Sequence, residues 1–483
     1  MKLFSRDFLY TAFFFLLPLL YFLSLPVSTS DLAIWTALGV QGIKTGSIPI
    51  YDTFSILPTS KMIYPSWGIS WLYGLIYLNS GKWGISFLSL FHKSVLFLYL
   101  FLIYRRYILK IPNRWHSKNL VLILIFFLGS SFIYVDRPAL VAILPFLFAF
   151  TLIDQNTQLS IKNILKLVGI TILWINIHAS ALLVILMLAW KIISSVIVEK
   201  WTGKKSLDYK SFSVAIAATC AALTFNPFGF QIFSYALQTA TISNLRKFDE
   251  WLSPFHFNDI FHSSLYFLWL LFFLYIFFKE IKNRNYRLFI SPYFFLTMMG
   301  LLSIRDIVWT FFLIVPMMMV NEPKNYFPKV QSSFFNLVVA ALLFCLCACL
   351  NPFYRPDFIG NLNPARYSLK ELLPEEEIQI ILKSGVKKPI MNDLQTGGYI
   401  SLRLPNKIFI DARNIIFSDD AFRELHTVFS VGNDWKKILN KYQFGFILLV
   451  KSNDSKKIII EIEKSLEWKV VSSRVNYFLA ERI

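Results

Sequence analysis

Two aspartates near the start of the chain combine a chemically useful residue type with an unusual setting. Asp31 and Asp52 lie in a stretch that follows the first apolar segment and is rich in aromatic, Gly and Pro residues. A carboxylate beside a membrane can accept a proton, bind a metal ion or pair with a cation. The alternative for Asp31 is to cap a helix that starts at Leu32, and the spacing in PIYDTFS favours a turn at Asp52. The residues alone leave both alternatives open.

Two arginines at the ends of later apolar runs are candidates for binding an anion. Arg137 and Arg305 each stand beside an acid. An arginine offers a planar fork of donors that suits phosphate. The alternative is a local ion pair of each arginine with its neighbour, Asp136 or Asp306.

A histidine, an asparagine and two tryptophan-containing stretches complete the candidate residues. His178 ends the run WINIH, where a hydrogen-bonded structural histidine is the alternative to a functional one. Asn176 lies two residues before it, on a different face of a helix. Glu250-Trp251 joins an acid to an aromatic ring, a frequent combination in sugar-binding sites.

Composition indicates which elements must position these residues. The chain of 483 residues is 56% hydrophobic and 17% aromatic, and only 16% of its residues are charged, against about 25% in soluble proteins. Apolar runs of membrane-spanning length recur between residues 8 and 350, so we expect an all-α polytopic membrane protein. These runs predict about eleven transmembrane helices, at about residues 8–26, 84–104, 119–135, 138–153, 164–178, 180–198, 211–226, 263–278, 288–303, 307–320 and 334–350.

The distribution of basic residues orients these spans. Under this model the loops on the N-terminal side hold about eighteen Lys and Arg, and the opposite loops about seven, which places the N-terminus in the cytoplasm. We expect residues 67–78 to form a surface helix, because counting them as a span would put RRYILKIPNR and KKSLDYK outside. Residues 8–26 are expected to remain as an uncleaved span, with cleavage near Ser28 as the alternative. All the candidate residues above then face outward.

The predicted organisation is a transmembrane domain followed by an outer domain. Residues 1–350 form the first, with a large first outer loop at 27–83. Residues 351–483 read as an outer α/β domain. Its expected helices are at 372–383, 434–442 and 455–466, the last capped by Asp454, and its expected strands are KPIMND, KIFIDAR, FGFILLV and WKVVSSRVNYFLAER.

Two function classes are excluded on composition. The net charge of +19 lies mostly in short loops between apolar runs, as membrane orientation requires, so we expect no nucleic-acid partner. The four cysteines lie in apolar runs without a CxxC pair, so neither a disulfide framework nor a zinc site is predicted.

Taken in order, the motifs resemble a family of bacterial multi-pass proteins in the GT-C glycosyltransferase superfamily. That family has an Asp after the first span, a G…PxxDxFS segment and a Trp-rich helix, which match Asp31, residues 46–55 and Trp67 with Trp71. Its later motifs RP, W-x-N-x-H, NP-x-G, EW-x-SP, S-x-R, GGY and FIDGR match residues 137–138, 174–178, 226–229, 250–254, 303–305, 397–399 and 409–413. Here Ala412 replaces the Gly of the last motif, and Leu32 and Ala33 follow Asp31 where related transferases often have an acid. More distantly, the chain is similar to protein O-mannosyltransferases and lipid A aminoarabinose transferases.

The resemblance implies an inverting glycosyltransferase of the bacterial inner membrane, with a GT-C-like fold and a periplasmic tail. Its partners would be membrane lipids and a polyprenyl-phosphate-linked sugar, which it would transfer to an envelope acceptor on the outer leaflet. Asp31 would act as the general base, with Asp52 as the second catalytic candidate. The leaving phosphate would be bound by Arg137, His178 and Arg305, and the substrate by Trp67, Asn176, Glu250 and Trp251. A divalent cation, Mg or Mn, would be held by Asp31 and Asp52 if one is used.

Two other functions stay open at this point. A non-catalytic component of envelope polysaccharide or lipoprotein assembly would use the same fold as a scaffold. A lipid or sugar transporter would need charges in the middle of spans, and only Lys93, Lys166 and Lys191 fall within or near the apolar runs. The sequence does not specify the sugar, the acceptor or the oligomeric state.

Overall fold

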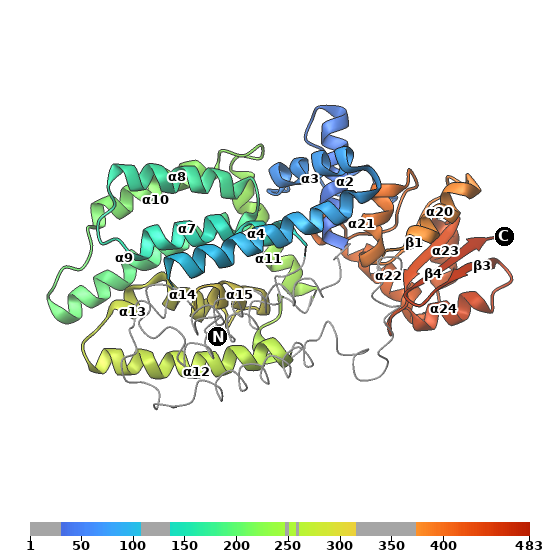
Figure 1. The fold of residues 1–483 in the computed structure, drawn as a ribbon. Coiled ribbons are helices and arrows are strands. Elements are labelled where there is room, and N and C mark those ends of the chain that lie inside the picture. Colours follow the sequence, from blue (N-terminus) through green and yellow to red (C-terminus); the bar gives the residue numbers. More distant parts are fainter. Residues whose placement is uncertain (1–29, 108–135, 247–250, 257–259, 315–372) are drawn as a thin grey trace, which may run out of the picture. The chain divides into compact units, whose positions relative to one another are not determined.

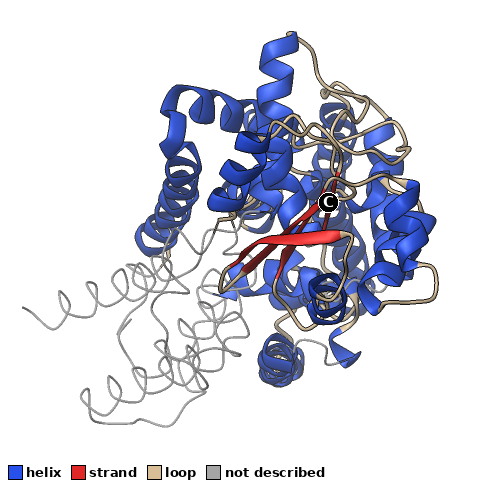
Figure 2. Ribbon diagram, turned by 90° about the vertical axis from the view of Figure 1, so that its right-hand side faces the viewer, coloured by secondary structure: helices blue, strands red, loops and turns tan. Residues whose placement is uncertain are grey.

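The computed structural model describes residues 30–107, 136–246, 251–256, 260–314 and 373–483, and is mostly helical with one small sheet near the C-terminus (Figures 1 and 2). The described residues fall into two compact units. The helical unit holds the described residues of 92–107 and 139–314. The mixed unit joins residues 30–91 and 136–138 to the tail, 373–483. The predicted domain boundary at residue 350 lies outside the described residues.

The helices between residues 84 and 314 follow the predicted apolar runs. Within the described residues, three are long and apolar enough to cross a membrane: Gly84–Arg106, Ala179–Thr202 and His262–Lys282. The helices are α4 Gly84–Arg106, α6 Pro138–Val141, α7 Ile143–Asp154, α8 Ile161–Ile175, α9 Leu183–Thr202, α10 Tyr209–Leu223, α11 Gln231–Leu245, α12 Ile260–Lys282, α13 Arg287–Ile290, α14 Pro292–Met299 and α15 Ile304–Phe312, with the 3₁₀ turns η4 Ala179–Leu182 and η6 Pro254–His256. The predicted spans 8–26, 119–135 and 334–350 lie outside the described residues, so a total of about eleven stays a prediction.

One helix of this region was not expected. The predicted spans at 211–226 and 263–278 leave residues 231–245 in the loop between them, but these residues form α11. Its sequence QIFSYALQTATISNL mixes Gln, Ser and Thr with apolar residues, so a search for continuous apolar runs passes over it. The loop prediction was therefore wrong for these residues.

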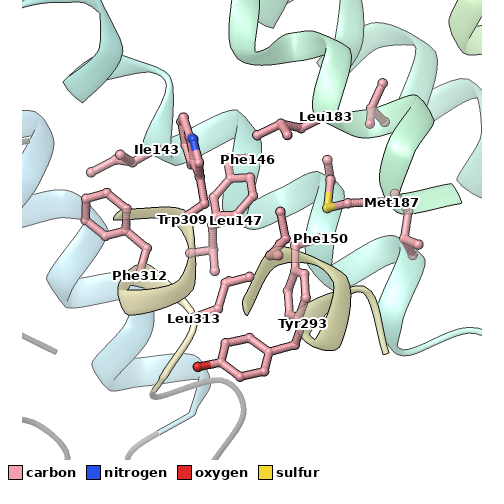
Figure 3. Close-up of a cluster of buried hydrophobic side chains, with 14 of the residues drawn as sticks. Ile143, Phe146, Leu147, Phe150, Leu183, Met187, Tyr293, Trp309, Phe312 and Leu313 are labelled. Atoms are coloured by element: carbon pink, nitrogen blue, oxygen red, sulfur yellow. The ribbon is translucent and has the colours of Figure 1, made fainter. Parts of the chain in front are cut away.

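Aromatic packing holds the helical unit together (Figure 3). Phe146 of α7 meets Trp309 of α15 with ring centroids 4.7 Å apart and Trp174 of α8 at 5.9 Å, both edge to face. Each of these rings is buried. Because edge-to-face pairs add to the energy of burial, this cluster ties three helices to one another.

In the mixed unit, α2 and α3 cross backbone to backbone. Helix α2 spans Ser30–Thr45 and α3 spans Trp67–Ser80, which confirms the predicted helix at 67–78. A Cβ on Gly39 would lie 1.8 Å from the Ser70 carbonyl oxygen, and one on Gly74 would lie 2.6 Å from the Gly39 carbonyl carbon. Only glycine at both positions permits so close a crossing. The turn η1 Gly81–Trp83 then leads into α4.

The tail contains a four-stranded sheet in the order β1-β2-β4-β3 (Figure 2). β1 pairs parallel with β2, whereas β4 is antiparallel to both β2 and β3. The strands are β1 Ile390–Asn392, β2 Phe446–Val450, β3 Trp468–Ser473 and β4 Tyr477–Arg482. The helices are α20 Glu375–Ser384, α21 Leu394–Arg403, α22 Asp419–Ser430, α23 Trp435–Lys441 and α24 Lys456–Glu463, with the 3₁₀ turn η8 Asn414–Ile416.

Several tail predictions need correction. The closing segment, predicted as one strand, is a β3–β4 hairpin, and KIFIDAR forms only isolated bridges at Ile408. Helices α21 and α22 were not predicted. Helix α24 is preceded by Ser455 as its N-cap, one residue after the predicted Asp454. The Phe409 amide donates both to the Ile390 carbonyl of β1, at 3.1 Å, and to the Asn392 side-chain oxygen, at 2.8 Å, and the pairing of KIFIDAR with β1 extends no further than the bridge at Ile408.

Candidate functional site

Asp31 and Arg137 face each other in the mixed unit. Asp31 lies in the first turn of α2, which begins at Ser30, and therefore not at the cap position before it. Its Oδ2 is 3.9 Å from Nη1 of Arg137, and the two side chains are 31% and 13% exposed. The distance between these two atoms is longer than a hydrogen bond, and the Asp31 side chain is partly exposed to solvent.

Asp136, the acid next to Arg137 in the sequence, makes a different contact from that of Arg137. Asp136 is buried and accepts a hydrogen bond from Ser89 Oγ at 2.8 Å. The structure thus places Arg137 against the carboxylate of α2, and the first Asp motif and the RP motif meet in space. This contact joins residues from two separate parts of the chain.

Asp52 is fixed by a turn and by a distant arginine. Its Oδ1 accepts from the Phe54 amide at 3.2 Å and its Oδ2 from the Ser55 amide at 2.9 Å, which confirms the turn that the PIYDTFS spacing favours. Oδ1 also lies 2.7 Å from Nη2 of Arg413 in the tail. Both carboxylate oxygens of Asp52 are therefore engaged within the protein.

Arg413 is shared between two carboxylates. Its Nε donates to Asp411 Oδ1 at 2.9 Å, and its Nη2 donates to Asp411 Oδ2 at 2.5 Å as well as to Asp52. The side chains of Arg413, Asp411 and Asp52 are 4%, 0% and 1% exposed. Burial alone would lower the pKa of the guanidinium, but Asp411 and Asp52 raise it above its ordinary value. The arginine is therefore charged at any physiological pH.

The backbone on either side of this cluster is also paired. The Ile56 amide donates to the Ile408 carbonyl at 2.9 Å, and the Ile408 amide donates to the Phe54 carbonyl at 2.9 Å. Ser55 Oγ donates to the Phe409 carbonyl at 2.8 Å. Ile408 in turn bridges to Ile390 of β1. The first-loop segment thus extends the tail sheet beyond β1.

Two tail motifs of the resemblance form one packed unit. Gly397 of the GGY motif lies so close to the FIDAR backbone that a Cβ on it would be 2.1 Å from the Ile410 carbonyl oxygen. Asn392 Nδ2 donates to that same carbonyl at 2.6 Å. Gly397 therefore permits the close approach that places Asp411 and Arg413 beside the first loop.

Trp67 belongs to the mixed unit as well. Its ring meets Trp71 edge to face at 6.2 Å on helix α3. Trp71 in turn lies over Gly42 of α2, where a Cβ would be 2.6 Å from Trp71 Nε1. These tryptophans help to dock α3 on α2.

In the helical unit, the W-x-N-x-H motif is connected by hydrogen bonds. His178 Nδ1 accepts from the Ser180 amide at 3.1 Å and contacts Ser180 Oγ at 2.8 Å, so the histidine caps η4. Trp174 Nε1 also donates to Ser180 Oγ, at 3.0 Å. Asn176 Nδ2 donates to the Phe225 carbonyl at 2.9 Å, which joins this motif to the NP-x-G turn.

The EW-x-SP and S-x-R motifs also meet in the helical unit. The Arg305 guanidinium lies 4.8 Å from the centroid of the Trp251 ring, a cation–π contact. Ser253 Oγ donates to the Leu301 carbonyl at 2.8 Å, and Ser303 caps the helix that carries Arg305. Glu250 lies outside the described residues.

The candidate residues thus form separate groups. Asp31, Asp52, Trp67 and Arg137 belong to the mixed unit, whereas the helical unit contains Asn176, His178, Trp251 and Arg305. Within the mixed unit the structure pairs Asp31 with Arg137 and Asp52 with Arg413. Asp411, Arg413 and Asn392 were given no role from the sequence. The signal that pointed to the first two was the D-x-R spacing of the FIDAR motif.

The residues proposed for a divalent cation do not fit one in their observed arrangement. Among the described residues, no group of three or more His, Cys, Asp and Glu side chains is placed to hold a metal ion. Asp52 already accepts two amides and a guanidinium. Asp31 faces a guanidinium as well. We therefore derive no step through a metal.

Comparison with known proteins gives structural matches alone. No protein-family model and no curated protein matches the sequence. Among solved structures, the chain is similar to the oligosaccharyltransferase AglB from Archaeoglobus fulgidus in complex with an inhibitory peptide and a dolichol-phosphate, at 9% identity and a TM-score of 0.49, covering 95% of this chain and 73% of that one. It is also similar to the apo oligosaccharyltransferase of Archaeoglobus fulgidus, at 11% identity and a TM-score of 0.47, covering 93% and 70%.

The matched proteins are GT-C glycosyltransferases, the superfamily that the sequence motifs resemble. At identities near 10% and TM-scores below 0.5, a likeness of this kind transfers neither activity nor substrate to the chain. The chemistry must be argued from its own residues.

Proposed function

We propose that the protein is an integral membrane glycosyltransferase that moves a sugar from a polyprenyl-phosphate donor to an envelope acceptor. In this proposal it is an inverting enzyme of the bacterial inner membrane, with about eleven spans, a cytoplasmic N-terminus and a periplasmic tail. Transfer takes place at the outer leaflet. The motif resemblance and the apolar helices support this assignment.

The single observation that carries the proposal is the Asp31–Arg137 pair. A partly exposed carboxylate lies 3.9 Å from a guanidinium, at the start of a helix and outside the long apolar runs. The other aspartate of the first loop is buried and occupied by donors. Asp31 is therefore the carboxylate of this loop that can exchange its partner for a substrate.

The pair supplies the two functions that inverting transfer needs. An acceptor hydroxyl attacks the anomeric carbon of the donor sugar, and its proton passes to Asp31 as the general base. The bond from the anomeric carbon to the phosphate oxygen breaks at the same time, and the polyprenyl phosphate departs with the electron pair. Arg137 offers donors to the oxygens of that phosphate as their charge grows. His178 and Arg305 are further proposed ligands of the phosphate, and Trp67, Asn176, Glu250 and Trp251 of the substrate.

The test is transfer by the purified full-length protein. Asp31→Asn keeps the size of the side chain and removes its basicity, so we expect transfer from a panel of radiolabelled polyprenyl-phosphate sugars to fall by about 10²–10⁴-fold. The matched control is Asp434→Asn, because Asp434 is an exposed tail residue paired with Lys437. An Asp31→Asn protein that is normally expressed and fully active would sink the assignment.

The same variants separate the enzyme from the non-catalytic alternative. Glycans and lipids of envelopes are compared between cells with the wild-type protein, cells with Asp31→Asn and cells without the gene. An enzyme requires that Asp31→Asn and deletion lose the same glycosylated species. If the protein is a scaffold, cells with Asp31→Asn should have the same glycans and lipids as the wild type. If it is a transporter, the glycosylated species should accumulate on the inner side of the membrane.

A further inference from the structure

We propose that Asp52 and Arg413 are positioning residues, which clamp the first outer loop to the tail and so hold the helix that carries Asp31. This inference rests on the proposed function for the role of Asp31, but the clamp itself can be measured without any transfer activity. It assigns to Asp52 a role other than that of a base or a metal ligand. It also assigns a role to the FIDAR motif of the tail.

The Asp52 carboxylate is already bound by groups of the protein itself. Its two oxygens accept from the amides of Phe54 and Ser55 and from Arg413, and the side chain is 1% exposed. A general base needs a lone pair that can reach the substrate. Asp52 offers its lone pairs to the protein.

The partner of Asp52 in the tail is an arginine, which can contact several groups at once. Arg413 presents Nε and Nη2 to Asp411 and the same Nη2 to Asp52, while its Nη1 lies 3.0 Å from Met62 Sδ. Its guanidinium also lies 5.5 Å from the centre of the Phe54 ring. A planar, permanently charged group can contact all of these at once, whereas the point charge of a lysine cannot. Arg413 of the tail therefore contacts loop residues on both sides of residue 55.

A series of contacts connects the clamp to α2, the helix that carries Asp31. The Met62 amide donates to the Ile50 carbonyl at 2.8 Å, which closes the loop that contains Asp52. Tyr64, two residues on, packs its ring 5.9 Å from that of Trp35. Trp35 stands four residues after Asp31 on α2, and residues four apart lie on the same face of a helix. The loop held by Arg413 thus packs against the face of α2 that presents Asp31.

A fourth contact ties α2 to the tail without the loop. Helix α2 packs directly on α21, the helix that contains the GGY motif. Gly397 in α21 touches the FIDAR backbone, as described above. Helix α2 is therefore connected to the tail in two ways, directly through α21 and through the first loop that the clamp holds.

The experiment measures amide hydrogen exchange in the full-length protein with Asp52→Asn. This variant leaves Asp411 paired with Arg413, so the tail keeps its own ion pair. We expect the amides of Ile56 and Ile408, which cross between the loop and the tail, to exchange at least tenfold faster, because a buried guanidinium loses one of its two carboxylates. Amides of β2, at residues 446–450, should exchange as in the wild type. Asp434→Asn is the matched control and should change neither set.

Activity then distinguishes a positioning residue from a base. Asp52→Asn should lower kcat by about tenfold and leave the pH profile of the remaining activity unchanged, since the base is still Asp31. Arg413→Lys keeps the charge but not the fork, so its exchange and its kcat should fall between those of the wild type and Arg413→Met. A lost acidic limb in Asp52→Asn would instead identify Asp52 as the base.

The outcomes separate this inference from the proposed function. Unchanged exchange at Ile56 and Ile408 in Asp52→Asn overturns the clamp, whatever the activity. Faster exchange that includes β2 also overturns it, because Asp52 would then support the whole tail. If the wild type shows no transfer while only the loop amides exchange faster, the proposed function fails and the clamp stands.

Discussion

The two aspartates of the first loop form aspartate–arginine pairs with opposite properties. Asp31 and Arg137 are 3.9 Å apart and partly exposed, whereas Asp52 and Arg413 are 2.7 Å apart and almost fully buried. A buried pair must be fully satisfied, because either charge left alone is costly. An exposed pair contributes little to stability and its members can change partners.

The difference indicates which carboxylate is available for chemistry. Asp52 has the stronger contacts and the better-matched partner, yet these contacts make it unavailable to a substrate. Asp31 lies 3.9 Å from its arginine, and its side chain is 31% exposed. The weaker of the two interactions therefore marks the stronger candidate for catalysis, and four predictions test this contrast.

Breaking the buried pair should have the largest effect on stability. Arg413→Met leaves Asp411 and Asp52 buried without their cation, and we expect the tail to lose about 3–5 kcal/mol of stability. Pulse proteolysis of the full-length protein in detergent measures this loss. The control is Arg423→Met, because Arg423 is 73% exposed and pairs with Asp420 on the same helix. Equal behaviour of the two variants would contradict the contrast between buried and exposed pairs.

Breaking the open pair should affect transfer far more than stability. Arg137→Gln removes the guanidinium from Asp31, and we expect transfer to fall by about 10²–10³-fold. The change in stability should stay below about 1 kcal/mol, because the two charged groups are 3.9 Å apart and Asp31 is partly exposed to solvent. Kinetics and pulse proteolysis on the same preparation give both values. A loss of stability comparable with that of Arg413→Met would show that the Asp31–Arg137 and Asp52–Arg413 pairs contribute equally to stability.

A third ion pair, between Glu377 and Arg474 of the tail, tests the buried case through the pH dependence of stability. Burial alone would raise the pKa of the Glu377 carboxyl, but hydrogen bonds from Arg474 and Ser472 lower it below its ordinary value of 4.5. A carboxyl with a depressed pKa stabilises the fold above its unfolded pKa, and this stabilisation is lost as the pH falls through the folded value.

Glu377→Gln should therefore cost about 1–3 kcal/mol at pH 7. The difference from the wild type should shrink as the pH falls below 4.5. Pulse proteolysis at several pH values, with an acid-active protease at the lower end, follows this change. A difference that is constant with pH would mean that packing, and not the ion pair, accounts for the cost.

Salt should give the smallest effect and separate the two pairs once more. At about 1 M salt the screening length is about 3 Å, so the small stability difference between the wild type and Arg137→Gln should vanish. The difference between the wild type and Arg413→Met should persist, because ions do not reach a buried pair. Equal salt sensitivity of the two differences would argue against the burial of Arg413.

Part of this arrangement follows from local sequence. The helix at residues 67–78 and the strands at KPIMND and FGFILLV were predicted correctly, because each is a short apolar segment bounded by polar, Gly or Pro residues. The turn at Asp52 was also expected, since an aspartate can accept from amides two and three residues ahead. Each of these features depends on residues close together in the chain.

Other features could not be read from a local pattern. Helix α11 lacks a continuous apolar run, and KIFIDAR, with its alternating apolar residues, resembles a regular strand but pairs with β1 and with the first loop only at Ile408. Asp31, for which a helix cap was the alternative to a functional role, lies inside the first turn of α2.

The sequence by itself determined that this is an apolar, largely helical chain with a mixed tail and with two aspartates in the first loop. The tertiary structure alone decided which arginine each acid meets. Asp52 and Arg413 are 361 residues apart in the chain, and no periodicity connects residues at that separation. Whether a carboxylate is buried against its cation or left open depends on how distant segments pack, and here that packing distinguishes Asp52 from Asp31.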